Sequence, residues 1–123
     1  MKIIEGRIKI SHIGSVPVQY IIKEEAGKII AVTTARRLKY ALVDNLDDQL
    51  DWLTPYNMQR SIVKKLHMPH TYRAIASLDP SDIWDEKEGL RVATAKLKDK
   101  MEKSVEKRIN ILKSYLHNAA DAL

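Results

Sequence analysis

An indole stands directly before the last and longest helical pattern of this sequence. Trp84 is followed by Asp85, and Gly89 lies within the first turns of the expected helix. A helix N-terminus favours anions, and an aromatic ring beside it can stack a nucleobase. Glycine in a helix costs about 1 kcal/mol relative to alanine, and it lets another group approach closely. A second interpretation stays open, in which Trp84 anchors the core and Gly89 is a packing notch.

Basic side chains could supply the phosphate contacts of such a ligand. A guanidinium suits bidentate phosphate contacts better than an ammonium group. The candidates are therefore Arg36, Arg37 and Arg91. Each one taken alone also fits a solvated surface charge.

Carboxylates and imidazoles lie at spacings that raise the question of a metal. Asp79, Asp82 and Asp85 could hold a hard cation such as magnesium. Helix capping and first-turn acids account for the same three residues without a metal. His67 and His70 lack the two further ligands that a metal site needs nearby. We therefore expect no metal and no cofactor.

Catalytic motifs are missing from the sequence. It contains no Gly-x-Ser-x-Gly, no His-Glu-x-x-His and no glycine-rich phosphate loop, and it has no cysteine and only 4 glycines. We expect a protein that binds a ligand and is not an enzyme.

Composition indicates one folded domain spanning residues 1–123. The chain is 45% hydrophobic and 30% charged, which is ordinary for a globular protein. It has no apolar run of about 18 residues and no secretory signal, so we expect a cytoplasmic protein without a membrane partner. The net charge is +5, and residues 46–85 form an acidic middle between two basic ends. This order suggests that anionic ligands meet the ends.

Four segments have the alternation or β-branched content of strands, and the first three are separated by turn residues. Residues 36–43 alternate as well and fit a strand better than a short helix. Two helices are expected in the middle, starting near Asn45 and Thr54. The sequence thus predicts an α+β fold with a small antiparallel sheet and a long C-terminal helix. The four strand segments are 2–10, 16–24, 28–34 and 71–78.

The C-terminal helix is expected over residues 86–118, with Asp85 and Glu88 in a capping-box arrangement. At 1.5 Å per residue it would be roughly 50 Å long. A compact chain of this size has a radius of gyration of about 14 Å. The helix must therefore break, for example near residues 107–110, or overhang its domain, and an overhanging apolar stripe predicts a homo-oligomer. The stripe is Leu90, Ala93, Leu97, Met101, Val105, Ile109, Leu112 and Leu116.

Residues 72–96 resemble a pattern found in small proteins of bacteriophages and prophages. The pattern combines a strand with small residues, a Pro-x-Asp turn, an aromatic-Asp pair, and then glycine and alanine at the start of a helix. Its members here are Ala74, Ala76, Pro80, Asp82, Trp84, Asp85, Gly89 and Ala93.

With its sheet and C-terminal helix, the layout is similar to the phage anti-Thoeris sponges. That resemblance implies a non-catalytic oligomer in the host cytoplasm that sequesters signals of the cyclic ADP-ribose type. It implies that Trp84 stacks the base, that Thr94 bonds it, and that arginines hold the phosphates. Two alternatives remain open: a small basic regulator that binds nucleic acid, and an inhibitor that docks on a protein through its long helix.

Overall fold

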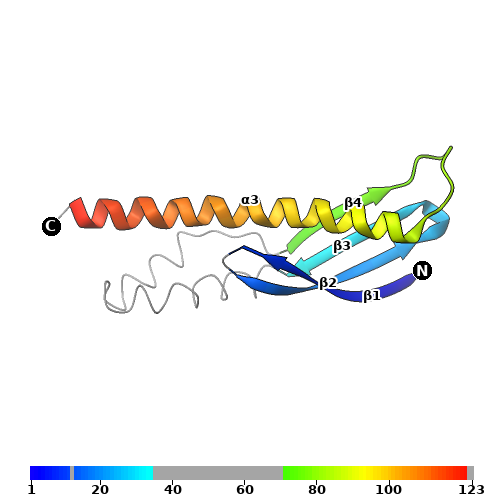
Figure 1. The fold of residues 1–123 in the computed structure, drawn as a ribbon, viewed down its shortest axis with the longest axis horizontal. Coiled ribbons are helices and arrows are strands. Elements are labelled where there is room, and N and C mark those ends of the chain that lie inside the picture. Colours follow the sequence, from blue (N-terminus) through cyan, green and yellow to red (C-terminus); the bar gives the residue numbers. More distant parts are fainter. Residues whose placement is uncertain (12, 35–70, 122–123) are drawn as a thin grey trace.

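One curved antiparallel sheet and one long helix make up the described part of the chain. The computed structural model describes residues 1–11, 13–34 and 71–121. The strands are β1 (Lys2–Ile10), β2 (Gly14–Lys23), β3 (Lys28–Thr34) and β4 (Thr71–Ser77), and the helix is α3 (Glu86–Asp121). The strand order is β1-β2-β3-β4, and all neighbours are antiparallel (Figure 1). The predicted α+β fold is confirmed. The expected strand 36–43 and the two middle helices lie outside the described residues.

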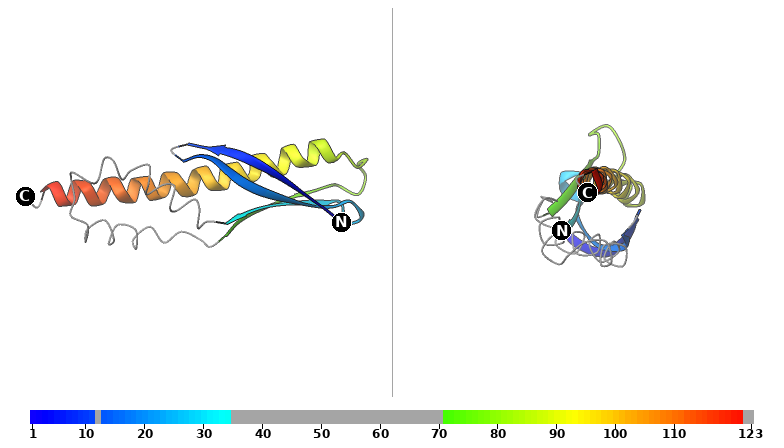
Figure 2. Two further views of the ribbon diagram at one scale, coloured as in Figure 1. Left: turned by 90° about the horizontal axis from the view of Figure 1, so that it is seen from below. Right: turned by 90° about the vertical axis from the view of Figure 1, so that its left-hand side faces the viewer.

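The strands form because apolar and polar residues alternate along them. In β4 the buried positions are Tyr72, Ala74 and Ala76, and their neighbours are exposed. The inward positions of all four strands face α3, and the sheet curves around the helix as a partial barrel (Figure 2). The edge strand β4 runs alongside α3, so the helix closes the open side of the curve.

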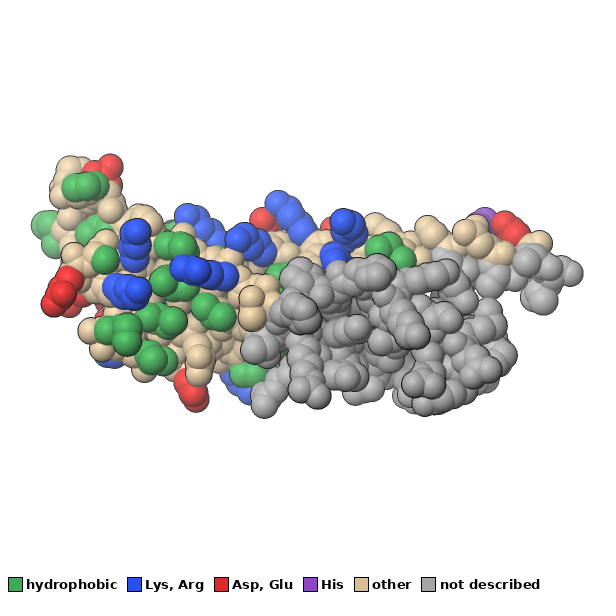
Figure 3. Space-filling model, turned by 180° about the vertical axis from the view of Figure 1, so that it is seen from behind, with side chains coloured by type: hydrophobic (Ala, Val, Ile, Leu, Met, Phe, Trp, Pro, Cys, Tyr) green, Lys and Arg blue, Asp and Glu red, His purple; other side chains and the backbone are tan. Residues whose placement is uncertain are grey.

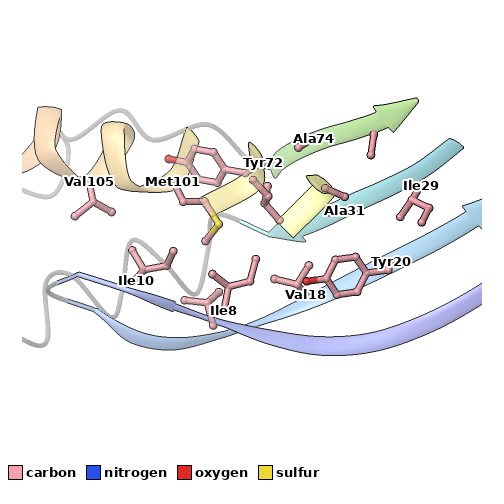
Figure 4. Close-up of a cluster of buried hydrophobic side chains, with 14 of the residues drawn as sticks. Ile8, Ile10, Val18, Tyr20, Ile29, Ala31, Tyr72, Ala74, Met101 and Val105 are labelled. Atoms are coloured by element: carbon pink, nitrogen blue, oxygen red, sulfur yellow. The ribbon is translucent and has the colours of Figure 1, made fainter. Parts of the chain in front are cut away.

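The core lies between the helix and the concave face of the sheet (Figure 4). Leu97 and Met101 of α3 are fully buried there. Ala31 and Ala74 are opposite each other in β3 and β4, and their small side chains let the helix approach. Truncating a buried side chain here leaves a cavity, because the hydrogen-bonded strands around it cannot move in to fill the space. The other buried hydrophobic residues include Ile8, Ile10, Val16, Val18, Tyr20, Ile22, Ile29, Tyr72, Ala93 and Val105.

Two hydroxyl pairs set the position of the helix on the sheet. Tyr20 Oη lies 2.7 Å from Thr94 Oγ1. Tyr72 Oη hydrogen-bonds to Ser104 Oγ, which is buried. A buried hydroxyl is costly unless it is paired, so these pairs favour one register of helix and sheet over others.

The helix is unbroken for 36 residues, about 54 Å at 1.5 Å per residue. It continues well past the ends of the strands (Figure 1). The predicted overhang is therefore present, and the alternative break near residues 107–110 is not. Leu112, in the part beyond the sheet, is only 5% exposed within the single chain. The buried members of the apolar stripe thus need no second copy to cover them, and the overhang gives no support for self-association through α3.

The convex face of the sheet carries one row of isoleucines. Ile3, Ile21, Ile30 and Ile75 are successive cross-strand partners on this face. The view from behind shows apolar side chains on the sheet, with Lys and Arg side chains around them (Figure 3). Among the described residues, no helix is both long enough and apolar enough to cross a lipid bilayer.

Candidate functional site

A pocket of about 580 Å³ lies where the loop after β4 enters α3. Its apolar part comes from β3, β4 and the first turns of the helix, and Trp84 contributes an indole. Four carboxylates, those of Asp79, Asp82, Asp85 and Glu88, complete the lining. The apolar and small lining residues include Gly27, Ile29, Ala76, Leu78, Ile83, Gly89 and Val92.

The backbone at the turn between β2 and β3 helps to position this pocket. Gly27 has φ +62°, a left-handed conformation that glycine adopts at little cost. Its carbonyl accepts a 2.7 Å hydrogen bond from Leu78 N. The loop that carries Trp84 is thereby tied to the β2–β3 turn, which brings residues 27–29 and 76–85 together.

Three of the four carboxylates are already held by neighbours in the chain. Asp79 Oδ1 accepts hydrogen bonds from Ser81 N and Oγ at 3.0 and 2.8 Å. Asp85 Oδ1 accepts one from Glu88 N at 3.2 Å, which caps the helix. The side chain of Glu88 does not complete the expected capping box but pairs with Arg91 at 2.6 Å.

These partners lower two carboxyl pKa values. The pKa of Asp79 lies below its ordinary 3.8 because the backbone N–H and then the hydroxyl of Ser81 bond the charged form. The pKa of Glu88 lies below 4.5 because the Arg91 guanidinium hydrogen-bonds to it. Both groups therefore stay ionised at neutral pH, and the pocket is anionic.

The two lowered pKa values predict a loss of stability in acid. A carboxyl whose folded pKa is depressed stabilises the fold above its unfolded pKa, and this contribution disappears as the pH falls through the folded value. We expect Asp79→Asn and Glu88→Gln to lower the melting temperature slightly at about pH 7, because both groups are exposed. The gap to the unmodified protein should narrow as the pH falls below the ordinary pKa values of 3.8 and 4.5 and through the lowered folded values. Thermal melts by circular dichroism at a series of pH values measure this, and a gap that widens in acid would contradict it.

Gly89 serves packing in the described structure. A Cβ atom at this position would lie 2.7 Å from Ile29 Cδ1. Since Ile29 is 1% exposed, its side chain has little freedom to move away. A side chain at position 89 would force the end of Ile29 to shift, so glycine lets the first turn of α3 rest directly on β3, which favours the packing-notch interpretation.

Three of the five sequence-predicted ligand residues lie in the described part of the chain, and one of these three lines the pocket. Trp84 lines it and is half-buried. Thr94 does not line it, and its hydroxyl is bonded to Tyr20. Arg91 is exposed and paired with Glu88. Arg36 and Arg37 lie outside the described residues.

The acidic wall of the pocket was not predicted as part of a site. The sequence did show acids at regular spacing around Trp84, but capping explained each of them singly. Capping is correct for Asp85, and yet the same group also lines the pocket. A cluster of acids around an aromatic residue is the signal that could have identified this wall.

Comparison of the chain with protein-family models, curated proteins and solved structures finds no match.

Proposed function

We propose that this chain is a non-catalytic binding protein whose pocket holds a planar, amine-bearing ring on the indole of Trp84. The observation that carries the proposal is the combination of the Trp84 indole, an apolar floor and four carboxylates in one pocket. A ring stacks on the indole, and its amino group donates hydrogen bonds to carboxylate oxygens. Because three of the carboxylates are held by structural partners, they suit recognition better than proton transfer.

A nucleotide-derived immune signal is the finer proposal, and it rests on the resemblance of residues 72–96 to phage sponge proteins. The adenine of such a signal has the ring and the amino group that this pocket favours. Its phosphates would have to lie away from the carboxylates, which repel them. Arg91 is already neutralised by Glu88, so Arg36 and Arg37 are the arginines left to test.

The test is a titration followed by the fluorescence of Trp84, in a Trp52→Phe background so that one indole reports. We expect adenosine to quench this fluorescence at least as strongly as AMP, and inorganic phosphate to leave it unchanged. For Trp84→Ala, titration calorimetry should show at least a fivefold loss of adenosine affinity, since stacking contributes about 1–3 kcal/mol per base.

Trp84→Phe is the matched control, because it keeps a ring and should keep most of the affinity. Circular dichroism of both variants checks the fold. Adenosine binding that is equally tight in Trp84→Ala would contradict the proposal. Phosphate binding without adenosine binding would contradict it too.

The geometry gives less support to the two alternatives, a regulator that binds nucleic acid and an inhibitor that docks through its long helix. The ammonium groups of Lys96 and Lys100 donate to backbone carbonyls of β4, and Lys103 pairs with Asp99. These cations of α3 are therefore partly engaged within the chain, which weakens the case for a nucleic-acid surface. The apolar stripe of α3 is largely buried, which weakens the case for protein docking through it.

A further inference from the structure

The two edges of the sheet differ in how their backbone groups are covered. On the outer edge of β4, Lys96 Nζ donates to Ile75 O at 3.2 Å and Lys100 Nζ donates to Arg73 O at 2.6 Å. The four-residue step from Lys96 to Lys100 rises about 6 Å along the helix, which nearly matches the rise of about 6.8 Å over two strand residues, so both bonds form together. These lysines occupy acceptors that another strand would need, which protects this edge.

The helix α3 also packs against β1, but no lysine of the described helix bonds the backbone on the outer edge of this strand. Within the described parts of the chain, no side chain hydrogen-bonds to a backbone group of β1. Among the described residues, polar contacts of the helix lie at the start of this strand and just after its end: Lys2 Nζ lies 2.8 Å from Glu86 Oε1, and Ser11 N donates to Glu102 Oε1 at 2.9 Å. A nine-residue strand whose outer backbone groups have no side-chain partner among the described residues is a template for another strand.

The sequence of β1 is complementary to itself when it is reversed about Gly6. If Gly6 faces Gly6 of a second antiparallel strand, Glu5 lies opposite Arg7 on both sides of the symmetry axis. In the same register Ile4 lies opposite Ile8, and both inward faces stay on one side of the sheet. Glu5 and Arg7 are exposed on the convex face, and neither has an ion-pair partner within the described residues.

Neighbouring registers lose this complementarity. A shift by two residues places Glu5 opposite Glu5 or Arg7 opposite Arg7, and like charges directly opposite are destabilising. A shift by one residue places inward-facing side chains opposite outward-facing ones. The register centred on Gly6 is therefore favoured by both charge and face.

We propose that the partner of β1 is a second copy of this chain, paired antiparallel about a two-fold axis at Gly6. The two sheets then form one continuous sheet, in which β1 of one copy pairs with β1 of the other. In this pairing Ile3, which is 57% exposed, lies beside the aliphatic stem of Lys9 from the second copy. The surface differs from the helix stripe, and it does not depend on the pocket beside Trp84.

Charge reversal at the two facing positions tests the pairing. We expect the unmodified chain to form dimers in sedimentation velocity and native mass spectrometry. Glu5→Lys alone and Arg7→Glu alone place like charges opposite each other twice. Each should weaken the dimer by about tenfold or more, because two attractive contacts become repulsive.

An equimolar mixture of the two single variants should form heterodimers. In the mixed pair the introduced lysine faces the introduced glutamate, and native Arg7 faces native Glu5. The double variant Glu5→Lys/Arg7→Glu should pair with itself as the unmodified chain does, although it lacks the hydrogen bonds from Arg7 to Ser15. Since all these variants change exposed side chains, circular dichroism should show unchanged secondary structure.

Glu106→Lys is the matched control, because it makes the same charge change on an exposed face of α3 and should leave the dimer intact. A monomeric unmodified chain at concentrations near 1 mM, an order of magnitude at which even weak pairs associate, would overturn the proposal. Dimers of the single variants as stable as those of the unmodified chain would also overturn it, and would point to another surface. So would a mixture that contains no heterodimer.

Discussion

Replacing Leu97 with alanine is expected to lower the free energy of unfolding by about 2–5 kcal/mol, the usual cost of such a deletion in a rigid core. The side chain is 0% exposed and lies where α3 rests on the sheet. The helix cannot settle into the cavity, because Tyr20–Thr94 and Tyr72–Ser104 hold it on both sides along its length. Urea denaturation followed by circular dichroism measures the loss.

Lys98→Ala is the control for this deletion. It truncates the side chain of the next residue of the same helix. Because Lys98 is exposed, the free energy of unfolding should change by no more than about 0.5 kcal/mol. If Leu97→Ala lowers the free energy of unfolding by less than about 1 kcal/mol, the helix must move toward the sheet to fill the cavity. The hydroxyl pairs would then not set its position.

Replacing Gly6 with valine is expected to destabilise the fold by about 1–3 kcal/mol, the range typical of overpacking. Strand propensity taken alone predicts the opposite, because valine favours strands and glycine does not. In the structure, however, a Cβ atom at Gly6 would lie 2.9 Å from Tyr20 Cε2. The ring cannot swing away easily, since it is 7% exposed and its hydroxyl is bonded to Thr94.

A double-mutant cycle isolates this contact. In a Tyr20→Leu background the ring is absent, so Gly6→Val should cost less there by about 1 kcal/mol or more. Ser77→Val, at an exposed position of β4, is the control for strand propensity and should change the stability by less than about 0.5 kcal/mol. An equal cost of Gly6→Val in both backgrounds would show that the ring of Tyr20 is not its cause.

Much of the fold could be predicted because the patterns that define it are local. The alternation over residues 2–10 and the β-branched run 28–34 predicted β1 and β3 with their observed bounds. Asp85 and the apolar stripe predicted where α3 begins. Hydrophobic periodicity and helix capping depend on residues that lie within one or two turns of each other. Both can therefore be recognised in the sequence alone.

The candidate site could be predicted only in part, because its chemistry depends on distant neighbours. Thr94 was expected to bond a ligand, yet the hydroxyl of Tyr20 lies beside it. Arg91 was expected to hold phosphate, yet Glu88 neutralises it. Whether a charge or hydroxyl is free for a ligand follows from what the fold places next to it, and no pattern of spacing contains that information.

The sequence by itself determined the strands, the long helix, its N-terminal cap and the presence of an aromatic residue before it. Only the tertiary structure decided that β4 pairs with β3, that acids lie around Trp84, and that lysines of α3 bond the backbone of one edge strand, β4, and not that of the other, β1. The physical reason is that elements form from local periodicity, whereas pairing, burial and charge neutralisation are settled between segments far apart in the chain.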